Sequence, residues 1–177
     1  MCFKPKFLRN IQVPKFQLDC EKLKYVTVHK YLGCFIHNQL CDNDDIKRQM
    51  RSTYARDNLI IKRFRHCTDD VKVKLFKSYC CNFYGICLWS KYTQECRKKL
   101  ITAFKRIFRG LFNCDKYNTT VTMINMHVDP FIVIERKLVF GFRNRVFLSD
   151  NSILSAITDC NTFHRSSLNL VWNLRLF

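Results

Sequence analysis

The sequence predicts an α+β fold that is mainly α, in which short N-terminal antiparallel β-strands are followed by a basic helical bundle. Three observations predict this fold class. Residues 16–36 have the composition of β-strands, and after residue 41 the apolar period changes from two to about 3.6 residues. The 177 residues include only 4 Gly and 3 Pro, which argues against a disordered linker or a turn-rich sandwich.

The predicted strands lie in residues 16–36, which are enriched in β-branched and aromatic side chains. Pro5 and Pro14 interrupt the chain before them. Gly33 is placed inside the last strand, where a glycine is typical of a bulge or of a close approach between backbones. The pattern therefore predicts a β-rich first region over residues 1–41.

The first helix is predicted to begin near Asn43. Asp42 or Asn43 can cap it, and Asp44 and Asp45 lie in the first turn, where the positive end of the helix dipole stabilises carboxylates. The apolar residues recur at helical spacing and form one predicted buried face: Ile46, Met50, Tyr54, Ile61 and Phe64.

Two further helix starts are predicted at Thr68, which Asp69 and Asp70 follow, and at Thr93. The second helix is predicted to bury Val71, Leu75, Tyr79, Phe83 and Ile86. The third is predicted to bury Leu100, Ala103, Phe104, Ile107, Phe108 and Leu111. These helices complete a basic helical region over residues 42–114.

The third region, residues 115–177, begins with a predicted polar loop over residues 115–120. Asp129 and Pro130 then form an N-cap and first helical position. Gly141 lies inside the helix that follows, at a cost of about 1 kcal/mol relative to alanine. A short helix over residues 153–157 and an apolar end over residues 168–177 are predicted to finish the chain. The predicted face of the fourth helix is Ile134, Leu138, Phe142 and Val146.

The net charge predicts a polyanionic partner. The chain has 31 Lys and Arg against 14 Asp and Glu, a formal charge of +17, which repels itself in the compact state. Nucleic acid and an anionic membrane surface both fit, but the apolar helix faces are needed for the core, which disfavours the membrane. With no long apolar run and no secretory signal in residues 1–10, we expect a nuclear or cytoplasmic protein that is not secreted.

No catalytic residue and no metal site are predicted. The eleven cysteines contain no C-x2-C pair, and we interpret Cys80, Cys81 and Cys87 as small core residues. The two Asp-Asp pairs stand before apolar helical runs, which favours helix capping over a pair of metal ions. His66 and Cys67 are sequence neighbours, so they point apart on a helix end and lack an orienting acid.

The basic residues are the candidate nucleic-acid contacts. Residues 43–67 hold seven Lys or Arg and residues 93–116 hold another seven, interleaved with aromatic and amide side chains. This arrangement suits phosphate contact from one face and core burial from the other. The alternative is a solvated cationic surface. The candidates are Lys47, Arg48, Arg51, Arg56, Lys62, Arg63, Arg65, Arg97, Lys98, Lys105, Arg106 and Arg109.

An ordered set of short strings adds a family resemblance. The strings are Phe3-Lys4-Pro5-Lys6, Lys30-Tyr31-Leu32-Gly33, the helix start at residues 42–49, and residues 67–72, 75–80 and 88–92. Over roughly residues 1–155 they resemble the C-terminal part of reverse transcriptases of non-LTR (LINE-type) retrotransposons. The resemblance implies that residues 1–36 are the last palm strands. Residues 42–112 would then be thumb helices that grip RNA and RNA/DNA duplex, and the remainder a connection region.

The resemblance also implies what this chain lacks. The family's catalytic aspartates, which hold Mg²⁺ in the full-length RNA-directed DNA polymerase, lie upstream of the matching region. We therefore expect a fragment with no cofactor of its own and no polymerase activity alone. Phe83 and Gly85 depart from the family pattern. The alternative hypothesis is a non-catalytic structural or interaction module, or a degenerate remnant, with no role in nucleic-acid binding.

Overall fold

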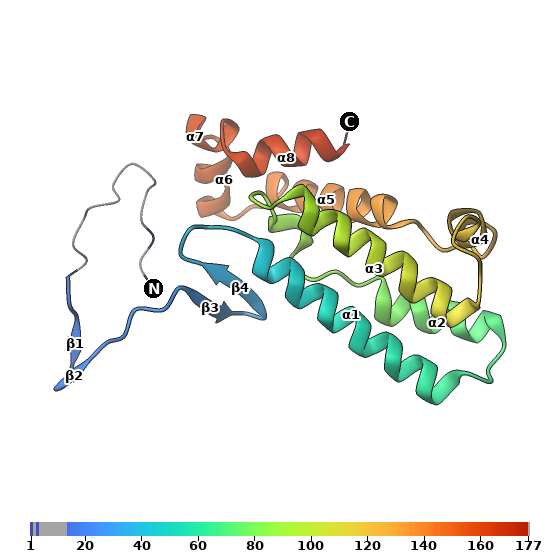
Figure 1. Cartoon of the computed structure of the whole chain (residues 1–177). Helices are drawn as coiled ribbons and strands as arrows, with labels where there is room; N and C mark the ends of the chain where they lie inside the picture. The colour runs from blue at the N-terminus through green and yellow to red at the C-terminus, as the bar shows by residue number, and fades with distance from the viewer. Residues whose placement is uncertain (2, 4–13, 177) are drawn as a thin grey trace.

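The computed structural model describes residues 1, 3 and 14–176, and it is mainly helical, with 61% helix and 7% strand (Figure 1). Two short antiparallel hairpins at the N-terminus precede a helical bundle, so the predicted fold class is confirmed. Residues 4–6, which carry much of the first string of the family resemblance, lie outside the described residues. None of the described helices is long and apolar enough to cross a bilayer.

The first hairpin pairs β1 (Gln17–Leu18) with β2 (Glu21–Lys22), and the second pairs β3 (Val28–Tyr31) with β4 (Cys34–His37). Leu32 and Gly33 connect β3 to β4 with φ angles of 44° and 82°. Two consecutive positive φ angles are characteristic of the tight turn that matches strand twist. The placement of Gly33 inside a strand was therefore wrong, because the apolar pattern continues unbroken through this turn.

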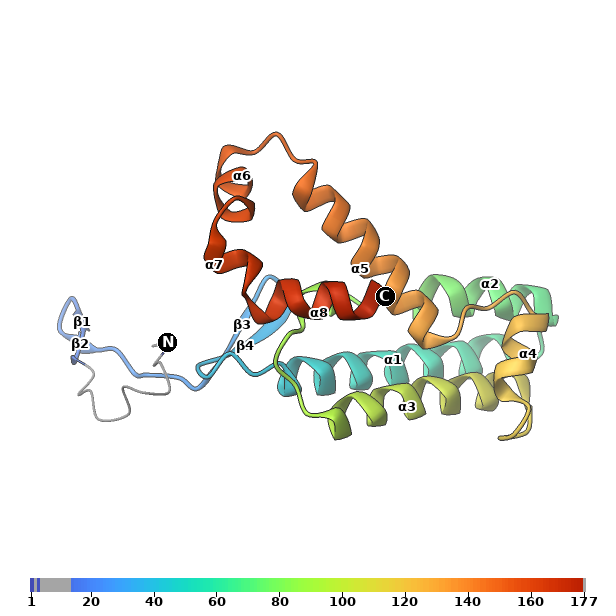
Figure 2. The same ribbon diagram turned by 90° about the horizontal axis from the view of Figure 1, so that it is seen from above.

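Three helices form the bundle. They are α1 (Asn43–Phe64), α2 (Asp69–Cys80) and α3 (Gln94–Phe112), and their starts confirm the predicted ones. A short turn returns α2 along α1, whereas α3 runs parallel to α1 (Figures 1 and 2). At one end the Thr93 backbone N–H donates to Asn43 Oδ1 over 2.9 Å, and at the other end Gly110 faces Ile61.

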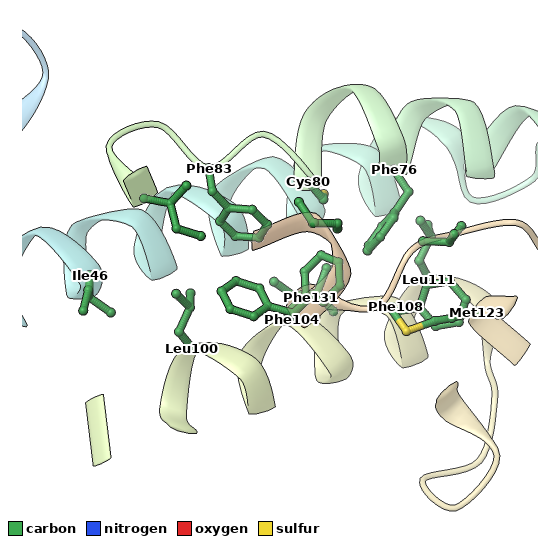
Figure 3. Close-up of a cluster of buried hydrophobic side chains, with 14 of the residues drawn as sticks. Ile46, Phe76, Cys80, Phe83, Leu100, Phe104, Phe108, Leu111, Met123 and Phe131 are labelled. Atoms are coloured by element: carbon green, nitrogen blue, oxygen red, sulfur yellow. The ribbon is translucent and has the colours of Figure 1, made fainter. Parts of the chain in front are cut away.

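The core lies between these helices and is rich in phenylalanine (Figure 3). All six residues predicted for the buried face of α3 are buried. The ring of Phe76 lies 5.4 Å from that of Phe104 and 5.4 Å from that of Phe108, and Phe83 lies 5.0 Å from Phe131. Such pairs add to the stabilisation from area burial alone. The α3 face therefore organises the core.

The predicted face of α2 was wrong at two of its three positions within the helix, whereas Leu75 packs half-buried against the core. Val71 and Tyr79 are exposed, and the helix instead buries Phe76 and Cys80. The helix ends at Cys80, so the buried Phe83 and Ile86 come from the irregular segment after it, which contains the 3-10 helix η1 (Ile86–Leu88). Gly85 permits this turn, since its φ is 89° and a Cβ there would lie 3.0 Å from Cys34 Sγ.

The last third of the chain contains three described helices that the sequence pattern did not predict. They are α4 (Thr119–Asn125), where the expected polar loop ends early, α7 (Asn161–His164), and α8 (Ser167–Leu176), where only an apolar end was expected. The fourth predicted helix is α5 (Phe131–Phe147), with Pro130 as N-cap in place of Asp129. It continues through Gly141 and buries Ile134, while the other three predicted face residues are half-buried. The predicted short helix is α6 (Ser152–Thr158), and α7 (Asn161–His164) and α8 (Ser167–Leu176) follow it.

Helix α8 packs on α5 and forms hydrogen bonds with the segment around η1. Trp172 Nε1 donates to the carbonyl oxygen of Cys87 over 2.7 Å. The Arg175 guanidinium donates to the carbonyl oxygens of Ile86 and Trp89 over 3.1 and 3.2 Å. Glu135, which is 2% exposed, forms ion pairs with Arg175 of α8 and with Arg97 of α3. The C-terminal helices are thus tied to the bundle by buried polar contacts.

Candidate nucleic-acid interface

The parallel pair α1 and α3 creates a long seam on the outside of the bundle. Lys47 and Met50 of α1 line a shallow hollow at its N-terminal end together with Cys96 and Lys99 of α3. At the C-terminal end, Gly110 of α3 approaches the side chain of Ile61. The residues of each helix that share a side with these positions must therefore border the seam along its whole length.

Helical spacing identifies the cations along this seam. From Lys47, steps of 4, 15 and 18 residues return to nearly the same side of α1, and from Lys99 a step of seven does so on α3. All six side chains reached by these steps are exposed. Lys47 to Arg65 spans about 27 Å at 1.5 Å per residue. We call this set the seam surface: Lys47, Arg51 and Lys62 from α1, its C-cap residue Arg65, and Lys99 and Arg106 from α3.

Four of the six cations of the seam surface form no ion pair with the described residues. The other two pair with neighbours on their own helix. Lys47 Nζ lies 3.5 Å from Asp44 Oδ1, and Lys99 Nζ lies 2.5 Å from Glu95 Oε1. Exposed pairs of this kind contribute only about 0.3–0.5 kcal/mol, so they yield readily to a phosphate. The seam surface is a row of solvated positive charges.

Three of the predicted contacts are engaged inside the protein. Arg48 Nε lies 2.6 Å from Asp45 Oδ1 on the same helix, and its Nη2 donates to the carbonyl oxygen of Tyr84 over 3.3 Å. Arg56 donates to the carbonyl oxygen of Tyr79 over 3.0 Å, near the C-terminus of α2. Arg97 pairs with the buried Glu135. Each of these guanidinium groups holds elements together, so a phosphate contact would compete with a fold contact.

The other predicted contacts lie at three kinds of place. Five of the nine belong to the seam surface, with Lys47 among them. Lys98 is exposed on α3, and Lys105 and Arg109 are half-buried in the next row round that helix. Arg63 is exposed on the other side of α1. Lys99 was not predicted, although its seven-residue spacing to Arg106 was the signal that could have found it.

The acidic residues near the start of α1 accept hydrogen bonds from distant segments, which the sequence pattern did not predict. Asp42 is the N-cap residue, but its side chain makes no capping bond. It instead accepts the backbone N–H groups of Ser90 and Lys91, each over 2.7 Å. Burial raises the pKa of Asp42, and these two hydrogen bonds act against the rise. The predicted side-chain cap at Asp42 was therefore wrong, because a distant segment uses the carboxylate.

Asp45 lies in the first turn as predicted, yet it is only 3% exposed. It accepts hydrogen bonds from the backbone N–H of Phe35 and from Trp89 Nε1, each over 2.9 Å, and pairs with Arg48. The carboxylate thereby joins β4, α1 and the segment after η1. Among the cap predictions, Thr93 does accept the N–H of Cys96, whereas the Thr68 side chain makes no cap hydrogen bond.

Behind the seam surface, α1 buries a row of polar side chains at four-residue intervals, namely Asp45, Gln49, Thr53 and Asp57. Gln49 Nε2 donates to the carbonyl oxygen of Asn82 over 3.0 Å, and Thr53 Oγ1 donates to that of Gln49 over 2.8 Å. Asp57 is 5% exposed, and its Oδ1 has no hydrogen-bond partner in the part of the chain that the structure describes. Desolvation raises the pKa of the Asp57 carboxyl to about 6.

The thiols and carboxylates of the described residues assemble no metal centre. Within residues 14–176 no three His, Cys, Asp or Glu side chains are placed to hold an ion. Cys80 is fully buried and Cys81 half-buried, and burial raises the pKa of each thiol to about 12. A thiol with such a pKa is almost entirely protonated at neutral pH and is a poor nucleophile or metal ligand.

Among the features described, the seam surface is thus the one best suited to bind a partner, because its exposed cations can contact an anion. Comparisons with protein-family models, with curated proteins and with solved structures return no match for this chain.

Proposed function

We propose that this chain binds RNA and RNA/DNA duplex through the sugar-phosphate backbone, with the seam surface as the principal contact. The observation that carries the proposal is the row of six exposed cations along the parallel helices α1 and α3. The proposal includes the family resemblance, in which these helices correspond to the thumb of a non-LTR retrotransposon reverse transcriptase. Gripping a template and primer, without polymerising, is the activity proposed for the chain.

The chemistry of the surface favours binding that ignores sequence. Lysine and arginine on exposed helix positions keep flexible stems, so they follow phosphates without reading base edges. If about 4 to 6 phosphates are neutralised, log K should fall against log salt with a slope of about −3 to −5. Different duplex sequences of the same length should bind with similar affinity.

The test is a salt titration of a variant in which Arg51, Lys62 and Arg106 are changed to glutamine together. These three form no ion pair with described residues and lie on the seam surface, so the fold should keep its circular dichroism spectrum. Affinity should fall for all duplex sequences about equally. The salt slope should flatten by roughly one unit for each lost contact.

A matched control removes the same charge elsewhere. Arg63, Lys74 and Lys77 are exposed but lie off the seam surface, so their change to glutamine lowers the net charge by the same amount. This control should keep a slope close to that of the wild type. Equal losses in both variants would mean that binding follows net charge alone, and a wild-type slope in the seam variant would mean a merely solvated surface. Either result would contradict the proposal.

A further inference from the structure

The connection between α3 and α4, residues 113–118, lies at the end of the bundle where α1 and α3 both finish (Figure 2). Gly110 of α3 faces Ile61 of α1, so the two helices are level at these residues. Four residues further along each helix direction, Cys114 lies in the connection and Arg65, the C-cap residue of α1, ends the cationic row. The connection therefore stands at the C-terminal end of the seam surface.

The connection is held at both ends. Asn113 takes a φ of 48°, which turns the chain out of α3. At the far end the buried Thr119 donates its hydroxyl to the carbonyl oxygens of Asp115 and Lys116, over 2.9 and 3.1 Å. Cys114 is half-buried. These contacts fix the backbone between Asn113 and Thr119, and they use no side chain at the tip of the connection.

At the tip, Tyr117 is 92% exposed, the highest value for a large apolar side chain among the described residues. Its ring forms no aromatic pair and its hydroxyl no hydrogen bond within the described part of the chain. An aromatic ring left in water contributes nothing to the core. Its neighbours Lys116 and Asn118 are also exposed, so the ring is presented beside a positive charge and an amide.

We propose that Tyr117 stacks on an unpaired nucleobase where the duplex on the seam surface ends. This inference rests on the proposed function, since the seam surface brings the backbone to this end of the bundle. Aromatic stacking suits a base of any identity, because every base has a π face, and Lys116 supplies a contact for the adjoining phosphate. The chain would thereby hold a junction between duplex and single strand, with the single strand over residues 113–118.

The experiment compares a blunt RNA/DNA duplex with the same duplex carrying a short single-stranded RNA overhang. The first unpaired position carries the fluorescent base 2-aminopurine. Wild type should bind the overhang substrate about 5- to 150-fold more tightly than the blunt one, the gain from stacking one base. Tyr117→Ala should lose that gain and the fluorescence change while binding the blunt duplex as wild type does. Tyr117→Phe should keep both.

A second variant separates stacking from charge. Lys116→Gln should weaken both substrates equally and lower the salt slope by about one unit, because a phosphate contact does not recognise an unpaired base. Circular dichroism of Tyr117→Ala should be unchanged, since the ring makes no core contact. Retention of the overhang gain in Tyr117→Ala, or an equal loss on both substrates, would overturn the inference.

The two proposals fail separately. If the seam variant keeps wild-type affinity for the blunt duplex, the proposed duplex grip is wrong. A Tyr117-dependent gain on the overhang would then still establish stacking on an unpaired base by itself. If wild type binds neither substrate nor a single-stranded RNA of the same length, both proposals are wrong.

Discussion

Asp57 makes the stability of this protein depend on pH, and replacing it by asparagine should remove the contribution of this carboxyl to that dependence. The Asp57 carboxyl of α1 is buried, its Oδ1 has no hydrogen-bond partner among the described residues, and desolvation raises its pKa from 3.8 to about 6. The folded state therefore favours the protonated form. Below about pH 4 the group is protonated in both folded and unfolded chains, and as pH rises through about 6 the folded chain loses this stability.

The magnitude follows from the shift. A rise of about 2 pKa units corresponds to about 3 kcal/mol at 1.36 kcal/mol per unit. The free energy of unfolding of wild type, relative to that of Asp57→Asn, should therefore fall by up to about 3 kcal/mol between about pH 4 and pH 8. This comparison does not depend on the constant cost of burying the new amide, because that cost is the same at every pH.

The assay is urea denaturation followed by circular dichroism across this pH range, for wild type and Asp57→Asn. Asp70→Asn is the control, since it makes the same chemical change at an exposed position at the start of α2. Its difference from wild type should vary with pH less than that of Asp57→Asn. Parallel curves for wild type and Asp57→Asn would refute the interpretation of Asp57 as a buried carboxyl without compensating donors.

Three further stability predictions use the same denaturation assay. Asp45→Ala should cost about 3 kcal/mol, because it leaves buried donors unpaired. Asp44→Ala should cost well under 1 kcal/mol, because the half-buried Asp44 makes only a solvent-accessible ion pair with Lys47. Thr93→Ala should cost about 0.5–2 kcal/mol through its lost cap, and Thr68→Ala less, so equal losses would contradict the assigned geometry. Gly85→Ala should cost at least about 1–2 kcal/mol, because its φ of 89° strains any residue with a Cβ, and a neutral effect would count against that turn.

The sequence by itself determined the helices with strong local signals. Asn43 and Thr93 mark the starts of α1 and α3 because a cap and a 3.6-residue apolar period depend on residues within a few turns of one another. The complete buried face of α3 followed for the same reason, since its apolar residues are dense and regular. The net charge of +17, and hence the class of partner proposed, also needed no structure.

Only the tertiary structure decided what the polar residues do. Asp42 and Asp45 looked like helix caps, but Trp89 and the backbone of the following residues, more than 40 positions away in sequence, take up their oxygens. Long-range contacts also separate Arg48 and Arg56, which donate to the carbonyl oxygens of Tyr84 and Tyr79, from Arg51 on the same helix, which forms no ion pair or hydrogen bond with the described residues. A charged residue on a helix looks alike in both roles, because its partner lies on another element.

The core face of α2 and the position of Tyr117 have the same explanation. Phe83 enters the core from the irregular backbone between the end of α2 at Cys80 and the left-handed Gly85, so no helical period could have revealed it. Tyr117 is exposed because the backbone on both sides of it is fixed. Thr119 donates its hydroxyl to the carbonyl oxygen of Asp115, and the positive φ of Asn113 turns the chain away from the axis of α3. Local periodicity specifies the elements of this protein, and the packing of elements distant in sequence decides which side chains remain available to a partner.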